Sequence, residues 1–258
     1  MYELDVFIPS LNLAIEYHGL YYHSHNYIET KEEKYKHFLK ADICGKNDVK
    51  LIQIFEDEWL FKKDLIKSIL KSKLGIIKNK IYARNCNIVE LSNNDFNKFC
   101  NDNHVQGYLN SKIKLGLVYL DKIVSVIGFN KKNEIYECTR FCNLQNTVVI
   151  GGASKLFFYF KKRYNPKIII TFADRRYSNG ELYQKLGFKL IGITNPGYFY
   201  IKNLNRYNRT LFQKHKLQNK LENFDQKLSE AQNMFNNGFR RIWDAGHYKF
   251  VYENNNFR

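Results

Sequence analysis

The segment ELDVFIPSLNLAIEYH, which runs from Glu3 to His18, contains two apolar stretches with a turn between them. Polar and apolar residues alternate over Glu3–Ile8, as in a strand with one solvated face. Pro9 interrupts this pattern and Leu13–Glu16 is again extended and apolar, so the two stretches are predicted to pair as a β-hairpin. This region also holds an unusual density of ionisable side chains: Glu3, Asp5, Glu16, His18, His23 and His25.

A small α/β unit over residues 1–75 is predicted to follow from this hairpin. Thr30 can cap a helix that runs to about Cys44, where Gly45 ends it. Leu51–Phe55 is predicted to be a third strand, and Leu60–Leu74 a second amphipathic helix.

The carboxylates of the hairpin form a candidate metal site. Side chains alternate along a strand, so Glu3 and Asp5 share one face, and Glu16 and His18 share another. Carboxylates that converge at one end of a hairpin can hold Mg²⁺, and a nearby histidine can act as general acid or base. The pattern predicts phosphodiester hydrolysis with Mg²⁺ or Mn²⁺ on Asp5, Glu16 and Glu3, and with His18 and His23 in the catalytic site.

Composition indicates a folded, basic protein. The 258 residues include 41 Lys and Arg against 25 Asp and Glu, a formal charge of +16, which favours a polyanionic partner or, alternatively, serves only solubility. Five scattered cysteines without a CxxC pair favour reduced thiols and a cytoplasmic location. No apolar stretch approaches the ~20 residues of a membrane span.

The N-terminal region resembles two known families. Asp5 followed by Glu16-Tyr17-His18 resembles the PD-(D/E)xK nuclease pattern, with His18 in the usual place of lysine. The longer stretch Ile15–His25 is similar to very-short-patch mismatch-repair endonucleases and to EDxHD homing endonucleases of phage introns. This resemblance implies a double-stranded DNA endonuclease of a phage mobile element, acting in the infected bacterial cell. It also implies metal binding by Asp5 and by Glu16 or the Tyr17 carbonyl, with His23 activating water.

A second unit is predicted over residues 83–202. Its elements run in the order helix, hairpin, strand, glycine turn into a helix, strand, short helix and closing strands at Phe188–Ile193 and Tyr198–Ile201. This order resembles the N-acetyltransferase fold. Val148–Leu156 is similar to the loop that holds coenzyme A pyrophosphate in that family, although Val148 replaces the usual Gln or Arg. Ser178–Phe188 is similar to the family motif Asn…Leu-Tyr…Gly-Phe.

The role of this second unit has two interpretations. It is expected to be a retained scaffold that does not use acetyl-CoA, since a glycine turn serves packing as often as phosphate binding. If the loop does bind the cofactor, Gly151, Gly152 and Ala153 are the residues that bind it.

The remaining residues, 203–258, are predicted to form a basic helical tail, with one or two exposed helices over Leu211–Met234. Basic side chains here and elsewhere are candidates for DNA binding. They are Lys36, Lys40, Arg140, Lys155, Arg175, Arg176, Arg206, Arg209, Lys214, Arg240 and Arg241.

The predicted fold class is therefore α/β (α+β): a small PD-(D/E)xK-type nuclease module, an N-acetyltransferase-like mixed-sheet domain and a basic helical tail. The predicted function is a metal-dependent, homing-type DNA endonuclease. Two alternatives remain open: an acetyl-CoA-dependent transferase acting on nucleic acid or a DNA-associated protein, and a non-catalytic DNA-binding phage component. The oligomeric state is also open, with a homodimer as one option.

Overall fold

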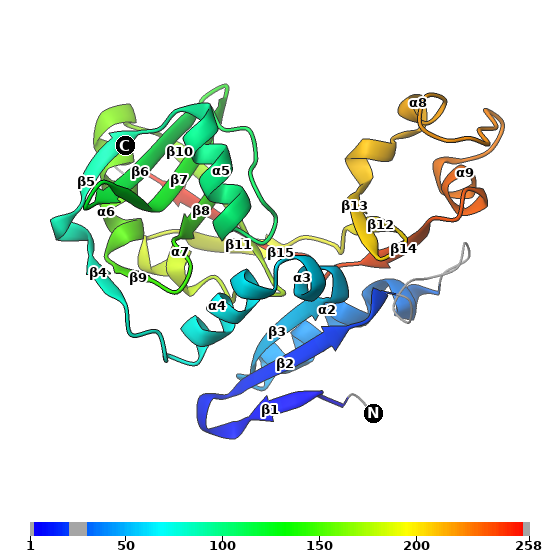
Figure 1. Cartoon of the computed structure of the whole chain (residues 1–258), viewed down its shortest axis with the longest axis horizontal. Coiled ribbons are helices and arrows are strands. Elements are labelled where there is room, and N and C mark those ends of the chain that lie inside the picture. Colours follow the sequence, from blue (N-terminus) through cyan, green and yellow to red (C-terminus); the bar gives the residue numbers. More distant parts are fainter. Residues whose placement is uncertain (1–2, 21–29, 255–258) are drawn as a thin grey trace. The chain divides into compact units, whose positions relative to one another are not determined.

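The chain forms two compact units, each built from several separate segments. The structure is a computed structural model that describes residues 3–20 and 30–254 (Figure 1). Unit 1 comprises residues 1–61, 174–179 and 193–247, and unit 2 comprises residues 62–173, 180–192 and 248–258. The structure thus divides the chain differently from the three consecutive domains predicted from the sequence. No helix in the described ranges is long and apolar enough to cross a membrane.

The predicted hairpin is present in unit 1. Strand β1 (Val6–Ile8) is antiparallel to β2 (Leu13–His18), with Val6 opposite Ile15 and Ile8 opposite Leu13, and the 3-10 helix η1 (Pro9–Leu11) joins them. Strand β3 (Lys50–Phe55) pairs in parallel with the other edge of β2. A parallel pair needs a crossover, and α2 (Lys31–Lys46) supplies it.

The helices between residues 30 and 74 begin or end at other residues than those predicted. Thr30 caps α2 in a capping box with Glu33, as predicted for a helix start, but α2 continues through Gly45. The single helix predicted over Leu60–Leu74 is two helices, α3 (Glu56–Phe61) and α4 (Lys63–Lys73). They separate at Lys62, whose φ of −131° is not helical.

Most of the predicted tail, residues 203–247, is part of unit 1. Strand β12 (Tyr198–Lys202) is the centre of an antiparallel sheet, between β13 (Asn205–Asn208) and β14 (Arg240–Trp243). A small core beside this sheet contains Tyr200, Leu217, Leu221, Met234 and Phe239. The helices predicted over Leu211–Met234 are short in the structure: η3 (Arg209–Phe212), α8 (Lys214–Leu217) and α9 (Glu230–Asn236).

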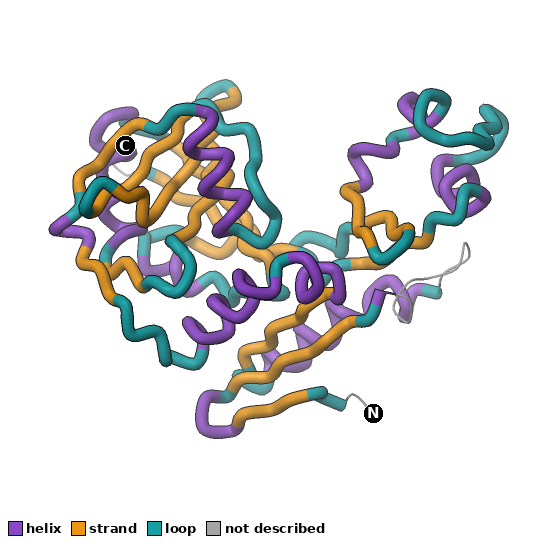
Figure 2. The backbone as a smooth tube through the Cα atoms, in the orientation of Figure 1, coloured by secondary structure: helices purple, strands orange, loops and turns teal. Residues whose placement is uncertain are grey.

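Unit 2 is built on a seven-stranded mixed sheet (Figure 2). Its strands, in spatial order, are β11 (Lys189–Ile193), β15 (His247–Glu253), β10 (Ile168–Asp174), β8 (Ile135–Asn143), β7 (Lys122–Lys132), β6 (Ile113–Tyr119) and β5 (Asn87–Glu90). Strands β5 to β8 are antiparallel neighbours, whereas β8 and β10 are parallel.

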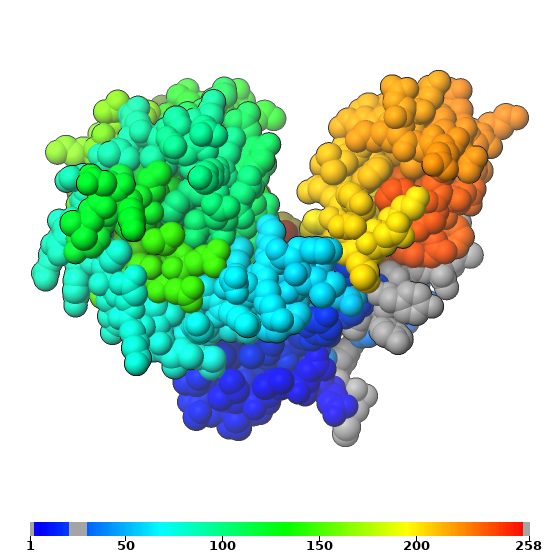
Figure 3. Space-filling view, in the orientation of Figure 1, coloured from blue at the N-terminus to red at the C-terminus, as the bar shows by residue number. Residues whose placement is uncertain are grey.

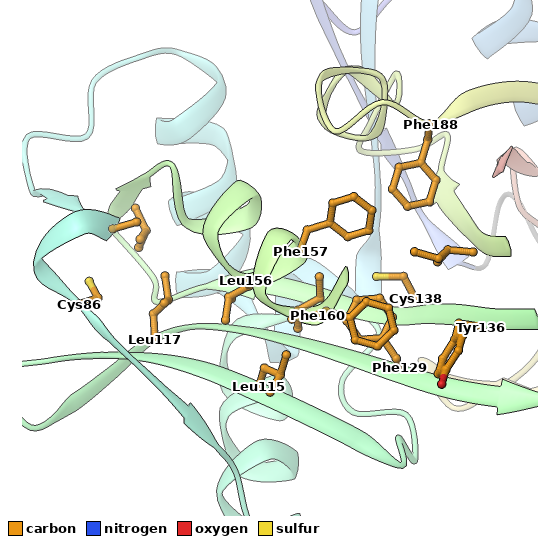
Figure 4. Close-up of a cluster of buried hydrophobic side chains, with 14 of the residues drawn as sticks. Cys86, Leu115, Leu117, Phe129, Tyr136, Cys138, Leu156, Phe157, Phe160 and Phe188 are labelled. Carbon is orange, nitrogen blue, oxygen red and sulfur yellow. The ribbon is translucent and has the colours of Figure 1, made fainter. Parts of the chain in front are cut away.

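Helices cover both faces of this sheet. Val126 and Ile127 are adjacent on β7 and therefore point to opposite faces. Val126 packs in a cluster with residues of α5 (Asn93–Asn103), and Ile127 in the larger core with residues of α6 (Gly152–Tyr164). In that larger core the rings of Phe129 and Phe160 stack with their centroids 3.6 Å apart (Figure 4).

The remaining elements of unit 2 are short. Helix α7 (Glu181–Lys185) precedes β11. Strand β4 (Lys80–Tyr82) pairs in parallel with β9 (Val148–Ile150), and the 3-10 helix η2 (Ala83–Asn85) follows β4.

The last strand of the sheet was predicted only as a short extended end of the tail, near Arg240–Tyr252, and not as part of this sheet. Phe188–Ile193 was predicted to be followed by Tyr198–Ile201 as a closing strand, but the latter, as β12, belongs to the sheet of unit 1. Strand β15 closes the sheet of unit 2 instead, lying between β10 and β11. Both segments have strand-like composition, so local pattern does not distinguish them.

Gly180 is expected to be essential to the stability of unit 2. Its φ is +81°, and a Cβ at this position would lie 2.2 Å from Cζ of the buried Phe250. Backbone strain and overpacking together should make Gly180→Ala destabilising by about 2–5 kcal/mol in urea unfolding followed by circular dichroism. Gly75→Ala is the control, because Gly75 has a similar φ of +72° but no atom within 4 Å of the added Cβ. Equal losses in the two variants would contradict a packing role for Gly180.

Candidate functional site

Strands β8 and β10 form a fork in unit 2. Their parallel pairing extends from Ile135 opposite Ile168 to Cys138 opposite Thr171. Beyond this point, in the described chain, residues 139–143 of β8 have no partner on β10. The fork therefore opens at the carboxyl ends of the two strands, which is where open α/β sheets bind their ligands.

The side chain of Tyr183, from α7, reaches the base of this fork. Its hydroxyl is hydrogen-bonded to the side chain of Thr171, and the Thr171 hydroxyl also donates to the Cys138 carbonyl at 3.1 Å. The Tyr183 ring is held between Phe188 and Phe250, at centroid distances of 5.6 Å from each. Burial, with Cys138 nearby, raises the pKa of Tyr183 well above its ordinary value. The hydroxyl therefore keeps its proton at neutral pH and can donate it.

The glycine loop after β9 leads into a helix with an open N-terminus. Gly151 has a φ of +76° and no side chain caps α6. A Cβ on Gly151 would meet only the Cβ of Ala83, at 3.8 Å, and both Gly151 and Ser154 are exposed. Backbone N–H groups at a helix start attract anions, and the sequence candidates Gly151, Gly152 and Ala153 lie together at this helix start.

The segment around β4 borders the glycine loop and the start of α6. The Val148 N–H donates to the Asn79 carbonyl at 3.0 Å. The Lys155 ammonium donates to the carbonyls of Ala83, at 2.9 Å, and Cys86, at 2.6 Å. Both groups are therefore engaged, and the open N–H groups begin at Gly151. The pairing of β4 with β9 was not predicted from the sequence, because a strand of three residues has no recognisable pattern.

The hairpin carboxylates in unit 1 do not form a metal centre. Glu16 is buried, and its carboxylate accepts the Asp5 N–H at 3.1 Å and binds the Lys40 ammonium at 2.5 Å. The Asp5 carboxylate accepts the Tyr17 N–H at 2.8 Å, and Glu3 is exposed. Among the described residues no group of three or more His, Cys, Asp or Glu could hold a metal ion. The prediction of Mg²⁺ or Mn²⁺ on Asp5, Glu16 and Glu3 is wrong, because Asp5 and Glu16 bind within the hairpin and Glu16 also binds Lys40.

The predicted catalytic histidines have other surroundings. His18 is buried, with Nε2 3.0 Å from Gln53 Oε1 and its ring stacked on His37 at 4.1 Å between centroids. His37 in turn lies 2.6 Å, through Nδ1, from the Trp243 carbonyl. His18 is therefore part of the interior of unit 1, and His23 lies outside the described residues.

Three of the predicted DNA-binding arginines are buried or partly buried in unit 1. Arg176 is 1% exposed and pairs with Glu58 at 2.9 Å and with Asp174 at 2.8 Å. Arg206 pairs with Glu58 at 2.5 Å, and Arg175 lies 3.4 Å from Asp42. These guanidinium groups therefore join separate segments of the unit through ion pairs.

Most of the other DNA-binding candidates are also engaged. Arg140 donates to the Gly107 and Thr139 carbonyls at 2.8 Å each, and Arg209 pairs with Glu230 at 3.1 Å. Further bonds to carbonyls or carboxylates are made by Lys40, Lys155 and Arg240. Arg241 lies near the rings of Tyr198 and Trp243, and Lys36 and Lys214 are exposed.

The chain was compared with known proteins. No family model matches it, and no curated protein matches it. Among solved structures it is similar to a Bacillus subtilis acetyltransferase in complex with CoA, at 13% identity and a TM-score of 0.38, over 66% of this chain and 99% of that one. A GNAT family acetyltransferase from Elizabethkingia anophelis with acetyl-CoA bound matches at 16% identity and a TM-score of 0.39, over the same shares.

A third match is an aminoglycoside 6'-N-acetyltransferase from Enterococcus faecium, at 12% identity and a TM-score of 0.37, over 65% of this chain and 96% of that one. These neighbours are transferases, not hydrolases, and the first two hold CoA or acetyl-CoA. The predictions of a metal-dependent endonuclease and of a scaffold without acetyl-CoA are corrected by these matches and by the lack of a metal cluster in the described residues. The chain has a mixed α/β fold, and the solved structures named here to which it is similar are acetyltransferases.

Proposed function

We propose that unit 2 binds a coenzyme A thioester and transfers its acyl group to an acceptor. The observation that carries this proposal is the fork between β8 and β10, which has the protonated Tyr183 hydroxyl at its base. The open N-terminus of α6, which follows β8 in the chain, supports it. The motif Asn179…Leu182-Tyr183…Gly187-Phe188 is a further, sequence-based support.

Each part of such a ligand has a fitting group in this unit. The N–H groups of Gly151, Gly152 and Ala153 would hold its pyrophosphate. The edge of β8 over residues 139–143, which β10 leaves unpaired, can bond an extended chain that contains amides. The bound thioester would supply the activated acyl group.

Tyr183 is proposed as the proton donor in this unit. Acyl transfer from a thioester releases a thiolate, which is a better leaving group when a nearby acid protonates it. The pKa of Tyr183 is raised above its ordinary value of 10.0, so its hydroxyl is protonated at neutral pH. The hydrogen bond to Thr171 and the contacts with Phe188 and Phe250 hold this hydroxyl in place.

The pyrophosphate part of the proposal is tested by Ser154→Glu. Ser154 is exposed and is the third residue of α6, where a carboxylate stabilises the helix but repels a bound phosphate. We expect wild-type protein to bind CoA and acetyl-CoA in calorimetric titrations, and Ser154→Glu to bind them at least tenfold more weakly without a loss of melting temperature. Ser154→Gln has the same shape without the charge and should bind normally. Wild-type protein that binds neither ligand, or a Ser154→Glu variant that binds them equally well, would overturn the proposal.

A further inference from the structure

The positive charge of this protein belongs almost entirely to unit 2. Unit 2 contains 24 Lys and Arg against 9 Asp and Glu, a net charge of +15, whereas unit 1 contains 17 against 16, a net charge of +1. In unit 1, moreover, arginines such as Arg176, Arg206 and Arg209 are neutralised by buried or partly buried carboxylates. An external polyanion would therefore be attracted to the acetyltransferase-like unit.

Within unit 2 the charge is concentrated between Lys62 and Arg84. This segment has eight basic residues and a single acidic one, Asp64. All the basic residues except Lys62 are exposed: Lys63, Lys67, Lys71, Lys73, Lys78, Lys80 and Arg84. The segment lies on the face of the molecule drawn in Figure 3, where it is cyan. We call these seven side chains the α4–η2 basic surface.

Helix α4 arranges part of this surface in a row. Lys63, Lys67 and Lys71 are four residues apart and follow one another along the solvent side of the helix, while Leu65 and Ile66 are buried. Four residues of α-helix advance about 6 Å, so the row is about 12 Å long. Like charges at this spacing repel each other and destabilise a helix. A polyanion bound along the row would remove that repulsion.

The basic segment is fixed beside the proposed cofactor loop. Ser68 of α4 accepts the Asn146 N–H at 2.7 Å, and Asn79 donates through Nδ2 to the Thr147 hydroxyl at 3.0 Å. Strand β4 then pairs with β9, which ends immediately before Gly151. The segment that carries the α4–η2 basic surface is thus hydrogen-bonded to the connection between β8 and α6, within the same unit.

Aromatic surface accompanies the charge. Tyr82 is 45% exposed, and the Arg84 guanidinium lies over its ring, 5.0 Å from the centroid. Exposed rings and guanidinium planes next to lysines suit stacking on bases and sugars as well as contact with phosphates.

We propose that the α4–η2 basic surface binds the phosphate backbone of a nucleic acid, and that the acyl acceptor is a group of that nucleic acid or of a protein bound to it. The acceptor part of this inference rests on the proposed function; the binding part does not. Electrostatic complementarity is its basis: a row of exposed lysines, an exposed ring and a net charge of +15 on one unit.

The binding part is tested with a triple variant, Lys67→Ala, Lys71→Ala and Lys78→Ala. A labelled DNA duplex, a labelled single-stranded DNA and a labelled RNA of random sequence are titrated with full-length protein at several salt concentrations. We expect wild-type protein to bind at least one of them, with a slope of log affinity against log salt that the triple variant reduces by about one for each lysine that contacts phosphate. The triple variant should bind at least tenfold more weakly at physiological salt.

A matched variant separates this surface from net charge alone. Lys132→Ala, Lys162→Ala and Lys167→Ala remove the same number of positive charges. These exposed lysines lie near the start of β8 and the end of α6, whereas Gly151 lies after the end of β8 and before the start of α6. The matched variant should retain most of the affinity. Equal weakening in both variants, no binding by wild-type protein, or binding only to vesicles that contain anionic lipid would overturn the proposal.

Titration with CoA distinguishes a failure of the nucleic-acid proposal from a failure of the acyltransferase proposal. The Lys67, Lys71 and Lys78 triple variant should bind CoA as wild-type protein does, because the N–H groups of α6 are unchanged. Loss of CoA binding in the triple variant with nucleic-acid binding intact would assign the lysines to the cofactor and contradict the nucleic-acid surface. Nucleic-acid binding by a protein that binds no CoA would leave the surface assigned and the acyltransferase proposal overturned.

Discussion

Glu58→Gln is expected to destabilise unit 1 by about 3–5 kcal/mol, since removal of one partner leaves buried charges uncompensated. Glu58 is 2% exposed and accepts four hydrogen bonds. Its Oε1 binds Arg176 at 2.9 Å and Arg206 at 2.5 Å, and its Oε2 binds the Tyr177 hydroxyl at 2.5 Å and the Phe55 N–H at 3.0 Å. These donors come from three separate segments of unit 1, so one carboxylate holds the segments together.

The effect of Glu58→Gln should depend on pH. Burial by itself would raise the pKa of Glu58, but Arg176 and Arg206 outweigh burial and lower this pKa to about 2, from 4.5. A carboxyl with a depressed pKa contributes its full stability above the unfolded value and loses that contribution as the pH falls through the folded value. The stability difference between wild type and variant should therefore be constant above about pH 4.5 and shrink as the pH falls towards about 2.

Tryptophan fluorescence during urea unfolding measures this effect on unit 1. Both tryptophans of the chain, Trp59 and Trp243, are in unit 1. Glu222→Gln is the control, because it removes the same charge from an exposed position of the same unit. A Glu58→Gln variant as stable as Glu222→Gln would show that the buried cluster does not hold the unit together.

Tyr183→Phe is expected to slow acyl transfer by a factor of about 10²–10⁴, the usual contribution of a positioned acid. The substitution keeps the ring between Phe188 and Phe250 and removes only the hydroxyl that bonds Thr171. CoA affinity should therefore be retained while turnover is lost. Because the pKa of Tyr183 is raised well above its ordinary value of 10.0, wild-type turnover should not decline through ionisation of this group near pH 10.

Turnover is measured by release of free thiol from acetyl-CoA, with pooled amines or nucleic acid as acceptor. Tyr159→Phe on α6 is the control, since the Tyr159 hydroxyl contacts Arg163 at 3.4 Å and does not reach the fork. A Tyr183→Phe variant with normal turnover, or one that also loses CoA binding, would remove Tyr183 from the proposed role.

Local sequence signals predicted much of the secondary structure correctly. The Pro9 break and the two apolar stretches predicted the hairpin, and Thr30 with Glu33 predicted the start of α2, because turns and caps depend on neighbouring residues. The order of elements from α5 to β11 matched the structure for the same reason. Gly151, Gly152 and Ala153 were correctly placed at a helix start.

The function predicted from the hairpin was wrong because the roles of its charged residues depend on distant partners. Strand alternation predicted a shared face for the carboxylates, but it contained no information on Lys40, which binds Glu16. Arg175 and Arg176 were predicted to line a DNA surface with the start of a helix that can bind a backbone phosphate. Two of their carboxylate partners, Asp42 and Glu58, are more than a hundred residues away in sequence.

The sequence by itself determined the basic charge, the hairpin, the caps and the order of elements, all of which follow from composition or from contacts between near neighbours. Only the tertiary structure decided that β15, not Tyr198–Ile201, closes the sheet of unit 2, and that residues 193–247 belong to unit 1. It also decided which basic side chains are neutralised by carboxylates and which, in the α4–η2 basic surface, remain exposed. The physical reason is that strand pairing and charge pairing between distant segments are selected by the burial of the whole chain, and several segments with the same local pattern compete for each place.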